Sequence, residues 1–399
     1  MRYLSAGESH GPCLTAIVEG LPSGLKVSKI AIDHQLERRQ GGYGRGGRMA
    51  IEKDHVEILS GLRFSQTIGS PLTLQIKNRD WENWQELMAA EGDPPSGAEM
   101  LTRPRPGHAD LAGGLKYGHD DLRLVLERSS ARETAIRVAV GSVGRILLEY
   151  FGLSISSHVV SIGAVSSRVG SSELPGLAEQ VEKSPVRCAD LAAEAKMLQE
   201  IDQARQDGDT VGGVIELMIT GVPPGLGSHV HWDRRLDGRL AGALMSIQAI
   251  KGVAVGAGFE GALMRGSALH DPIVFEKSKG ITRPSNRAGG FEGGITNGQP
   301  LVLRLAMKPI PTLLKPLPSV DWETGERAPG AVERSDVCAV PAAAVVAEAV
   351  AAWELAVAFR EKFAGDSLAE VEAAFDHYMT SVSKRLRQPD IVTEHGECQ

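Results

Sequence analysis

Apolar residues recur every three to four positions in several stretches of the chain, which is the spacing of one helix face. The clearest stretch is 134–148, where the positions sharing this face are Ile136, Val140, Val143 and Leu147. The stretch 30–40 has a similar pattern and stops at Gly41-Gly42, a typical end of a helix. The sequence therefore predicts helices over 30–40 and 134–148, together with 233–250 and 341–359.

Shorter apolar stretches between glycines predict β-strands. They are 50–59, 70–76, 211–220 and 301–307. Strands and helices do not alternate regularly along the chain, as they would in a parallel sheet built from βαβ units. The pattern by itself therefore favours an α+β fold in which helices pack against one face of a mostly antiparallel sheet.

The same pattern indicates how the chain is organised. No unit repeats along it and no break in composition divides it, so we expect one domain over 1–399 with a frayed tail of about a dozen residues. Prolines and glycines predict loops at 93–97 and 315–319. The longest apolar stretch contains Glu348 and Glu354, and acids near its centre predict a buried helix and exclude a membrane span.

Composition and charge narrow the class of function. The 399 residues carry a formal net charge of −7, which argues against a nucleic-acid partner. Glycine is abundant, with 46 residues, while aromatic residues make up 5%, as suits a protein that surrounds a polar small molecule. The cysteines, at positions 13, 188, 338 and 398, form no CxxC pair, which predicts neither a disulfide framework nor a zinc site. The N-terminus has no apolar leader segment, so we expect a cytoplasmic protein with no membrane partner.

Two glycine motifs match known signatures in the wrong context. Residues 7–11, GESHG, match the G-x-S-x-G turn of α/β-hydrolases, but six residues before Gly7 leave no room for the sheet that carries that turn. Either Ser9 is structural, or Ser9 and His10 project from the turn into a polar site. Residues 42–47 match G-x-G-x-x-G, but a predicted helix precedes them and a strand follows, which is the reverse of a dinucleotide-binding unit. This stretch also resembles an RGG segment that binds single-stranded nucleic acid. Otherwise it is a loop, which is either merely solvated or presents Arg45 and Arg48 to a ligand.

Loops rich in arginine lie elsewhere in this acidic chain. The basic and imidazole side chains that they present are Arg105, His108, Arg128 and Arg132. Ser130 and Glu133 fit a capping box at the start of the predicted helix, but capping does not explain the flanking arginines. Guanidinium groups suit phosphates and carboxylates, and a helix N-terminus attracts anions. These loops predict a site for a small, highly anionic, phosphate-bearing ligand.

Three other segments bear on that site. Alternating prolines hold 308–312 extended, which beside Gly293 suits a planar ring or is simply the exit from a strand. Asp336 either caps the buried helix or contributes a carboxylate to the site. His229 and His231 have metal-ligand spacing, but no third ligand accompanies them, so we predict no metal.

The sequence resembles the chorismate synthase family in eight segments that follow one another in family order and cover most of the chain. They are GESHG (7–11), RRQGGYGRGGRM (38–49), RPGHADLAGGLKYGHDDLR (105–123), RSSARETA (128–135), DRRLDGRLAGALMSIQAIKGV (233–253), GGITNG (293–298), KPIPT (308–312) and ERSDVCAVPAA (333–343). The resemblance implies a lyase of the shikimate pathway that converts 5-enolpyruvylshikimate 3-phosphate to chorismate. The reaction is an anti-1,4-elimination of phosphate that requires reduced FMN without net redox change. The resemblance further implies a β-α-β sandwich, with central helices between mainly antiparallel sheets, and a homotetramer.

The resemblance also implies roles for particular residues. His10 donates a proton toward the leaving phosphate, and His108 lies by the N1–C2=O edge of the flavin. Asp336, helped by Ser9, handles the flavin N5 proton. The side chains placed around the substrate anions are Arg39, Arg45, Arg48, Arg105, Arg132 and Arg334, and the positions of Arg39 and Arg45 are also linked to a dinucleotide phosphate. The residues placed around FMN are Arg128, Ser129, Ser130, Gln248, Ala249, Gly293, Lys308, Pro309, Ile310, Pro311, Thr312 and Arg334.

The source of reducing power and two competing functions stay open at this point. Some members of the resembled family reduce their FMN with NADPH, and others depend on an external flavin reductase. The sequence has no segment typical of an inserted reductase module, which favours the external reductase. A flavin-dependent oxidoreductase would use the same FMN pocket but consume NADPH in step with product. An RNA-binding protein acting through the loop at 42–48 would not respond to FMN.

Overall fold

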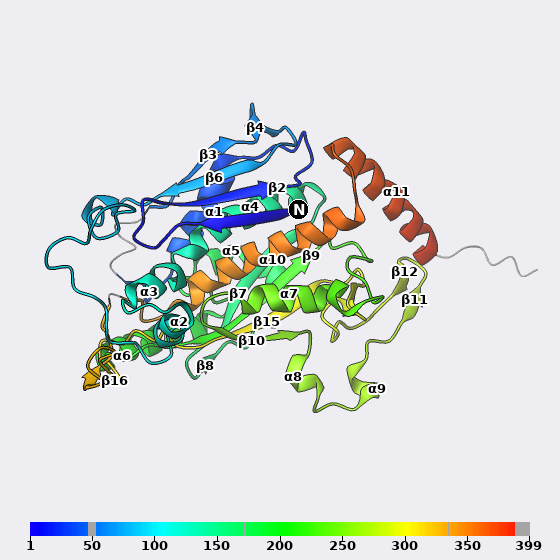
Figure 1. Cartoon of the computed structure of the whole chain (residues 1–399). Helices are drawn as coiled ribbons and strands as arrows, with labels where there is room; N and C mark the ends of the chain where they lie inside the picture. The colour runs from blue at the N-terminus through cyan, green and yellow to red at the C-terminus, as the bar shows by residue number, and fades with distance from the viewer. Residues whose placement is uncertain (47–52, 171–172, 334, 388–399) are drawn as a thin grey trace, which may run out of the picture.

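The computed structural model describes residues 1–46, 53–170, 173–333 and 335–387, which form two antiparallel sheets with helices between them (Figure 1). The first sheet has the order β1 (Arg2–Ala6), β2 (Cys13–Glu19), β6 (Leu72–Lys77) and β3 (Val56–Ser60). The second has the order β10 (Ile250–Val255), β15 (Leu301–Met307), β9 (Gly213–Thr220), β7 (Ser154–Ile162) and β8 (Val165–Ser166). The predicted α+β class is confirmed.

The layer between the sheets consists of α1 (Lys29–Gln40), α4 (Glu133–Tyr150) and α10 (Val340–Lys362) (Figure 1). Helix α4 packs on β2 and β6, and α10 packs on α4 and on β7 and β9. This arrangement confirms the β-α-β sandwich and corrects the expectation, drawn from the apolar pattern alone, that helices cover one face of a sheet. The sheets need a cover on their inner faces, and one helical layer supplies it to both.

Helix α10 is apolar all round because it is surrounded on all sides. Its alanines and valines are buried from Val340 to Ala358 with few exceptions. Among the described residues it is the one helix long and apolar enough to cross a membrane, and 89% of its most apolar window is buried inside the protein. The prediction of a buried helix is thereby confirmed. Helix α4 approaches it so closely at Gly141 that a Cβ there would collide with the carbonyl oxygen of Ala349.

The other elements surround this sandwich. The remaining helices are α2 (Asp110–Tyr117), α3 (Arg123–Ser129), α5 (Ala178–Lys183), α6 (Leu191–Asp207), α7 (Leu236–Met245), α8 (Gly258–Gly261), α9 (Gly266–Leu269) and α11 (Leu368–Arg387), with 3-10 turns at Trp81–Asn83, Leu174–Leu177 and Trp232–Arg234. Four strand pairs stand apart from the sheets: β4 (Leu62–Arg63) with β5 (Gln66–Thr67), β11 (Val274–Glu276) with β12 (Gly280–Thr282), β13 (Phe291–Glu292) with β14 (Ile295–Thr296), and β16 (Pro318–Val320) with β17 (Arg327–Pro329).

Several predicted boundaries are wrong. The helix expected over 233–250 ends at Met245, because Ala249 adopts a left-handed φ of 65° and strand β10 begins at Ile250. The strand expected over 50–59 begins at Val56, and positions 50–52 lie outside the described residues. The loop expected at 315–319 contains the first residues of β16. The loop at 93–97 is confirmed, and the tail expected to fray, 388–399, lies outside the described residues.

Candidate active site

The GESHG motif forms the turn between β1 and β2, and α3 holds it in place. The backbone N–H of Ser9 donates to the Glu127 carbonyl oxygen at 2.9 Å, and the backbone N–H of His10 donates to Glu127 Oε2 at 2.8 Å. His10 Nδ1 lies 2.7 Å from Glu127 Oε1, and the imidazole stacks on Trp84 with ring centroids 3.8 Å apart. The side chains of His10 and Glu127 are buried. The turn therefore presents a histidine whose ring plane and Nδ1 are fixed by neighbours far away in the sequence.

The two serines beside this turn are joined. Ser9 Oγ donates to Ser130 Oγ at 3.1 Å, and Ser130 Oγ also accepts the backbone N–H of Arg132 at 3.3 Å. Ser130 and Glu133 do not form the predicted capping box, since α4 begins at Glu133 with Arg132 as its N-cap and no side-chain cap. The Glu133 carboxylate instead accepts from Gln248 Nε2 at 3.2 Å. Capping is thus replaced by contacts that link the GESHG turn, the start of α4 and the segment before β10.

Two of the predicted anion-binding arginines share one buried carboxylate. Arg132 Nη1 lies 2.6 Å from Asp54 Oδ1, and Arg39 Nη1 lies 3.4 Å from Asp54 Oδ2. Arg39 also donates to the Ala131 carbonyl oxygen and to Thr134 Oγ1, at the N-terminus of α4. All three charged groups are at most 5% exposed. Both guanidinium groups lie beside a helix N-terminus, and that combination favours an anion.

The glycine loop after α1 brings Arg45 to Asp336. Arg45 Nη1 lies 2.9 Å from Asp336 Oδ2, and the Gly46 N–H donates to Asp336 Oδ1 at 2.7 Å. Asp336 is not the cap of α10, which has Ala339 at that position. The structure thus excludes the capping alternative, and a carboxylate of Asp336 inside the site stays a prediction. Arg48 and Arg334, which belong to the same prediction, lie outside the described residues.

A second histidine is held by the loop before α2. His108 Nδ1 lies 2.5 Å from Asp110 Oδ1, and Arg105 donates to both oxygens of Asp110, at 2.8 and 3.0 Å. Arg105 Nη1 also donates to Thr312 Oγ1 at 3.1 Å. Burial alone would raise the pKa of Asp110, but its hydrogen bonds to His108 and Arg105 outweigh burial and hold that pKa well below its usual range. A cavity of about 1070 Å³ opens beside Arg105 and His108.

The segment 308–312 contacts both the loop that holds His108 and the residues directly before β10. The Lys308 N–H donates to the Ala249 carbonyl oxygen at 2.9 Å, and Lys308 Nζ donates to the Gly107 carbonyl oxygen at 2.5 Å. Partial burial and the charge of Lys251 lower the pKa of Lys308. Gln248, next to the left-handed Ala249, has a buried Oε1 that accepts no hydrogen bond from the described residues. A carboxamide with an unpaired buried oxygen is a suitable place for a polar ligand.

Three other residues predicted to bind FMN have contacts of their own. Arg128 donates to the carbonyl oxygens of Gly7 and Ser5 and so ties α3 to the GESHG turn. The Ile310 carbonyl oxygen accepts from Thr210 Oγ1, which fixes the proline-bracketed segment. Gly293 lies apart: its nearest side chain is His229, and the next residue, Gly294, accepts from the Leu236 N–H.

Sequence reasoning missed the partners that orient the predicted residues. They are Asp54, Trp84, Asp110 and Glu127. Asp110 stands two residues after His108, and Glu127 directly precedes Arg128, so both were visible as neighbours of the motifs. Asp54 and Trp84 have no spacing that would have found them.

No metal centre emerges among the residues that the structure describes, which contain no group of three or more His, Cys, Asp or Glu suited to hold an ion. His231, one of the two histidines with metal-ligand spacing, pairs through Nδ1 with Asp233 Oδ1 at 2.7 Å. The pairing lowers the pKa of Asp233.

The site combines buried arginines around single carboxylates, two histidines each held by an acid, and a cavity beside one of them. These features are typical of an enzyme that acts on a small molecule. Comparison with known proteins narrows this class. Residues 1–359 match the family described as chorismate synthase. A chorismate synthase of Desulforudis audaxviator is 61% identical over 371 residues, which are 93% of this chain and 95% of that protein. One of Moorella thermoacetica is 58% identical over 393 residues, covering 96% of this chain and 100% of that protein.

A solved structure gives the same answer for the fold. A crystal structure titled as that of chorismate synthase superimposes with a TM-score of 0.78 at 44% identity, covering 96% of this chain and 98% of the other. The chain belongs to the chorismate synthase family and is a lyase. The resemblance read from the eight sequence segments is confirmed.

Proposed function

We propose that this enzyme eliminates phosphate from 5-enolpyruvylshikimate 3-phosphate in the anti-1,4 sense to give chorismate, with reduced FMN bound and no net redox change. In this reaction the carbon–oxygen bond to phosphate breaks, a C–H bond at C6 breaks, and the ring gains a double bond. The observation that carries the proposal is the buried Arg39–Asp54–Arg132 cluster at the start of α4. Ser130, two residues before Arg132, accepts a hydrogen bond from Ser9 of the GESHG turn. The substrate has a phosphate and two carboxylates, which suit guanidinium groups.

His10 is the proposed proton donor to the departing phosphate. With Nδ1 held by the Glu127 carboxylate, Nε2 is the atom proposed to deliver a proton to the phosphate oxygen. Stacking on Trp84 holds the ring in one orientation. Arg132 and Arg45 bind substrate anions in this proposal, and Arg39 and Arg105 contribute to the same binding.

The residues proposed for FMN fit a polar, planar ligand. Gln248 offers an unpaired amide oxygen, Lys308 offers a cation, and the strained backbone at Ala249 is of the kind that functional sites retain. The FMN contacts proposed are Arg128, Ser129, Ser130, Gln248, Ala249, Gly293, Lys308, Pro309, Ile310, Pro311, Thr312 and Arg334. Reduced flavin, when bound, supplies the electron density that assists loss of phosphate.

Two further side chains are proposed to act beside the cofactor. His108, held by Asp110, would face the N1–C2=O edge and stabilise the reduced ring, and its neighbour Arg105 would keep that acid ionised. Asp336, helped by Ser9, would accept the N5 proton. In the structure as described Asp336 pairs with Arg45 and Ser9 with Ser130, so both proton-handling groups already have partners that hold them in place.

Anaerobic release of phosphate from 5-enolpyruvylshikimate 3-phosphate tests the proposal. With photochemically reduced FMN we expect many turnovers per flavin, and with oxidised FMN none. One NADPH consumed per product would identify a flavin oxidoreductase and refute the elimination without net redox change. Equal activity without FMN would also refute it, and tight RNA binding without turnover would support the RNA-binding alternative.

Assembly, location and the reductant form the finer part of the proposal. Exposed apolar side chains such as Phe259, Leu263 and Leu4, which are 84%, 89% and 76% exposed, support a homotetramer in which other copies cover them. Light scattering on the purified protein in solution measures the number of copies in the assembly directly. We propose a cytoplasmic enzyme that receives reduced FMN from an external reductase. NADPH oxidation by the isolated enzyme and FMN would show that it reduces its own flavin.

A further inference from the structure

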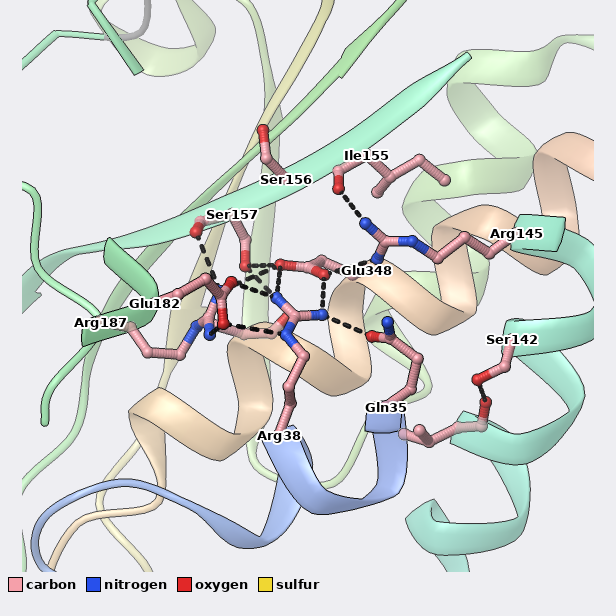
Figure 2. Close-up of polar contacts among 12 residues, drawn as sticks. Gln35, Arg38, Ser142, Arg145, Ile155, Ser156, Ser157, Glu182, Arg187 and Glu348 are labelled. Carbon is pink, nitrogen blue, oxygen red and sulfur yellow. Dashed lines mark hydrogen bonds and ion pairs between the residues drawn. The ribbon is translucent and has the colours of Figure 1, made fainter. Parts of the chain in front are cut away.

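A cluster of buried charges lies in the middle layer, and the proposed chemistry does not use it. Glu348, on α10, is 1% exposed and is surrounded by three arginines (Figure 2). Its carboxylate lies 2.7 Å from Arg38, 2.8 Å from Arg145 and 3.3 Å from Arg187. Ser157 Oγ donates to it as well, at 2.6 Å. Burial alone would raise the pKa of Glu348, but the three guanidinium charges outweigh burial and hold the pKa at about 2.

Of the three arginines, Arg38 leads directly to the candidate site. It stands on the last turn of α1, one residue before Arg39, and the two side chains point to different places: Arg38 to Glu348, Arg39 to Asp54. Arg38 is held firmly, because it also donates to Gln35 at 2.5 Å and to Glu182 at 2.6 and 3.0 Å.

After Arg38 the chain runs along the N-terminal part of α10 in the opposite direction. Gly42 packs on Pro341 so closely that a Cβ would stand 2.9 Å from the proline Cβ. Gly44 packs equally closely on Cys338, and its carbonyl oxygen accepts the Cys338 N–H at 3.2 Å. The series of contacts ends where Arg45 and the Gly46 N–H meet Asp336.

The glycines and the Arg38–Glu348 ion pair contribute differently to the alignment of residues 38–46 along α10. Gly42 and Gly44 have left-handed φ values of 107° and 89° and no side chains, so they permit the close approach but add no side-chain contact that would fix the register. Glu348 and Pro341 are seven residues apart, two helical turns, and therefore lie on the same face of α10. A bidentate pair between Arg38 and Glu348 on that face defines one alignment of the two segments.

We propose that the Arg38–Glu348 pair sets the register of residues 38–46 along α10 and thereby positions Arg39 and Arg45 in the candidate site. Arg38 and Glu348 are positioning residues, since neither is placed against substrate. The proposal rests on the proposed function only in naming the anion that these arginines bind.

Arg145 supplies a matched control for Arg38. It binds the same carboxylate at nearly the same distance and burial, with side chains 15% and 10% exposed. It stands on α4, however, twelve residues after Glu133 and on a helix that is locked against α10 at Gly141. Arg145 therefore contributes to the same charge cluster without connecting it to the glycine loop.

The test compares Arg38→Lys with Arg145→Lys in the full-length enzyme. Lysine keeps the charge and loses the fork of hydrogen bonds, so both variants are expected to lower the Tm to a similar extent. Arg38→Lys is expected to raise KM and the substrate Kd about tenfold, because a displaced anion contact loses most of a charge-assisted hydrogen bond. Arg145→Lys is expected to change both constants by about twofold at most.

Hydrogen exchange gives a readout that does not depend on the reaction. The amides of Gly46, Val337 and Cys338 donate within the register described above, and Arg38→Lys should speed their exchange about tenfold while Arg145→Lys leaves it unchanged. Equal effects of the two variants on KM and on exchange would overturn the proposal and make the cluster a simple stabiliser. If Arg38→Lys fails to fold, Gln35→Ala removes one support of Arg38 and must raise exchange at Gly46, or the proposal is refuted. Wild-type turnover, by contrast, tests the proposed function alone.

Discussion

Replacing Glu127 by glutamine tests whether the proton of His10 matters as the structure suggests. The carboxylate accepts twice from His10, from the backbone N–H at 2.8 Å and at Nδ1 at 2.7 Å. A glutamine has one oxygen and one NH₂ group. The backbone N–H can only donate, so the amide oxygen must face it, and the NH₂ group then faces Nδ1. Nδ1 must then accept a hydrogen bond. In a protonated imidazole Nδ1 carries a hydrogen, so its N–H and the N–H of the amide would face each other as two donors.

The size of the effect follows from these contacts. The protonated ring loses a charge-assisted bond of about 1.5–3 kcal/mol and gains an unpaired buried donor that costs about 1–3 kcal/mol, while the neutral ring keeps an ordinary bond. The net cost to the proton-donating form is about 2.5–6 kcal/mol, which corresponds to a kcat lower by about 70-fold or more.

The assay is anaerobic phosphate release at saturating substrate with reduced FMN, together with a Tm measurement to establish that the variant is folded. Glu19→Gln is the matched control, because Glu19 pairs with Arg2 at the surface and its side chain is 51% exposed. It should keep the wild-type kcat. A folded Glu127→Gln enzyme with kcat within about threefold of wild type would refute the role given to the Glu127–His10 pair.

Four more changes have defined outcomes. His108→Ala should lower kcat about a hundredfold or more with a smaller change in KM, and a normal kcat with a lowered Tm would make His108 structural. Arg132→Ala should weaken substrate binding about ten- to a hundredfold by calorimetry, and wild-type affinity would misplace the anion site. Because the pKa of Glu348 is about 2 in the folded chain against 4.5 for the free side chain, its contribution to stability is complete above pH 4.5 and falls toward pH 2, so the urea midpoint should drop between pH 6 and pH 3, and an unchanged midpoint would contradict this. Gly141→Ala should destabilise by about 3 kcal/mol, since the Ala349 carbonyl cannot yield without moving α10, and an unchanged Tm would show that the two helices can separate.

The fold was predictable where one segment's own pattern decides its structure. The helices at 134–148 and 341–359 and the strand at 301–307 agree with α4, α10 and β15 to within a few residues. Prediction failed near Ala249, where Ile247 and Ile250 continue the helical spacing but the backbone turns left-handed and enters a strand. Alanine has no intrinsic preference for that conformation, so only tertiary contacts account for it.

The site was predictable as a set of candidate side chains and unpredictable as a geometry. The motifs identified Ser9, His10 and Arg132, but His10 is oriented by an acid 117 positions away, and Arg132 by one 78 positions away. No spacing rule connects residues so far apart, because their proximity results from tertiary contacts, of α3 with the GESHG turn and of Arg132 with Asp54. The capping box predicted at Ser130 is wrong for the same reason. The local pattern of Ser130 and Glu133 is present, but Ser9, far away in the sequence, competes for the Ser130 hydroxyl.

The position of α10 in the chain has a consequence for how the protein is made. This helix covers the inner face of the second sheet on β7 and β9, yet it begins at Val340, after every strand of that sheet has been synthesised. Until the ribosome has released α10, the apolar inner face of the second sheet lacks this cover, and α10 itself has no polar face that would keep it soluble in water. The nascent chain is therefore most prone to aggregate late in translation, and truncation before residue 340 should yield insoluble protein, however complete the strands are.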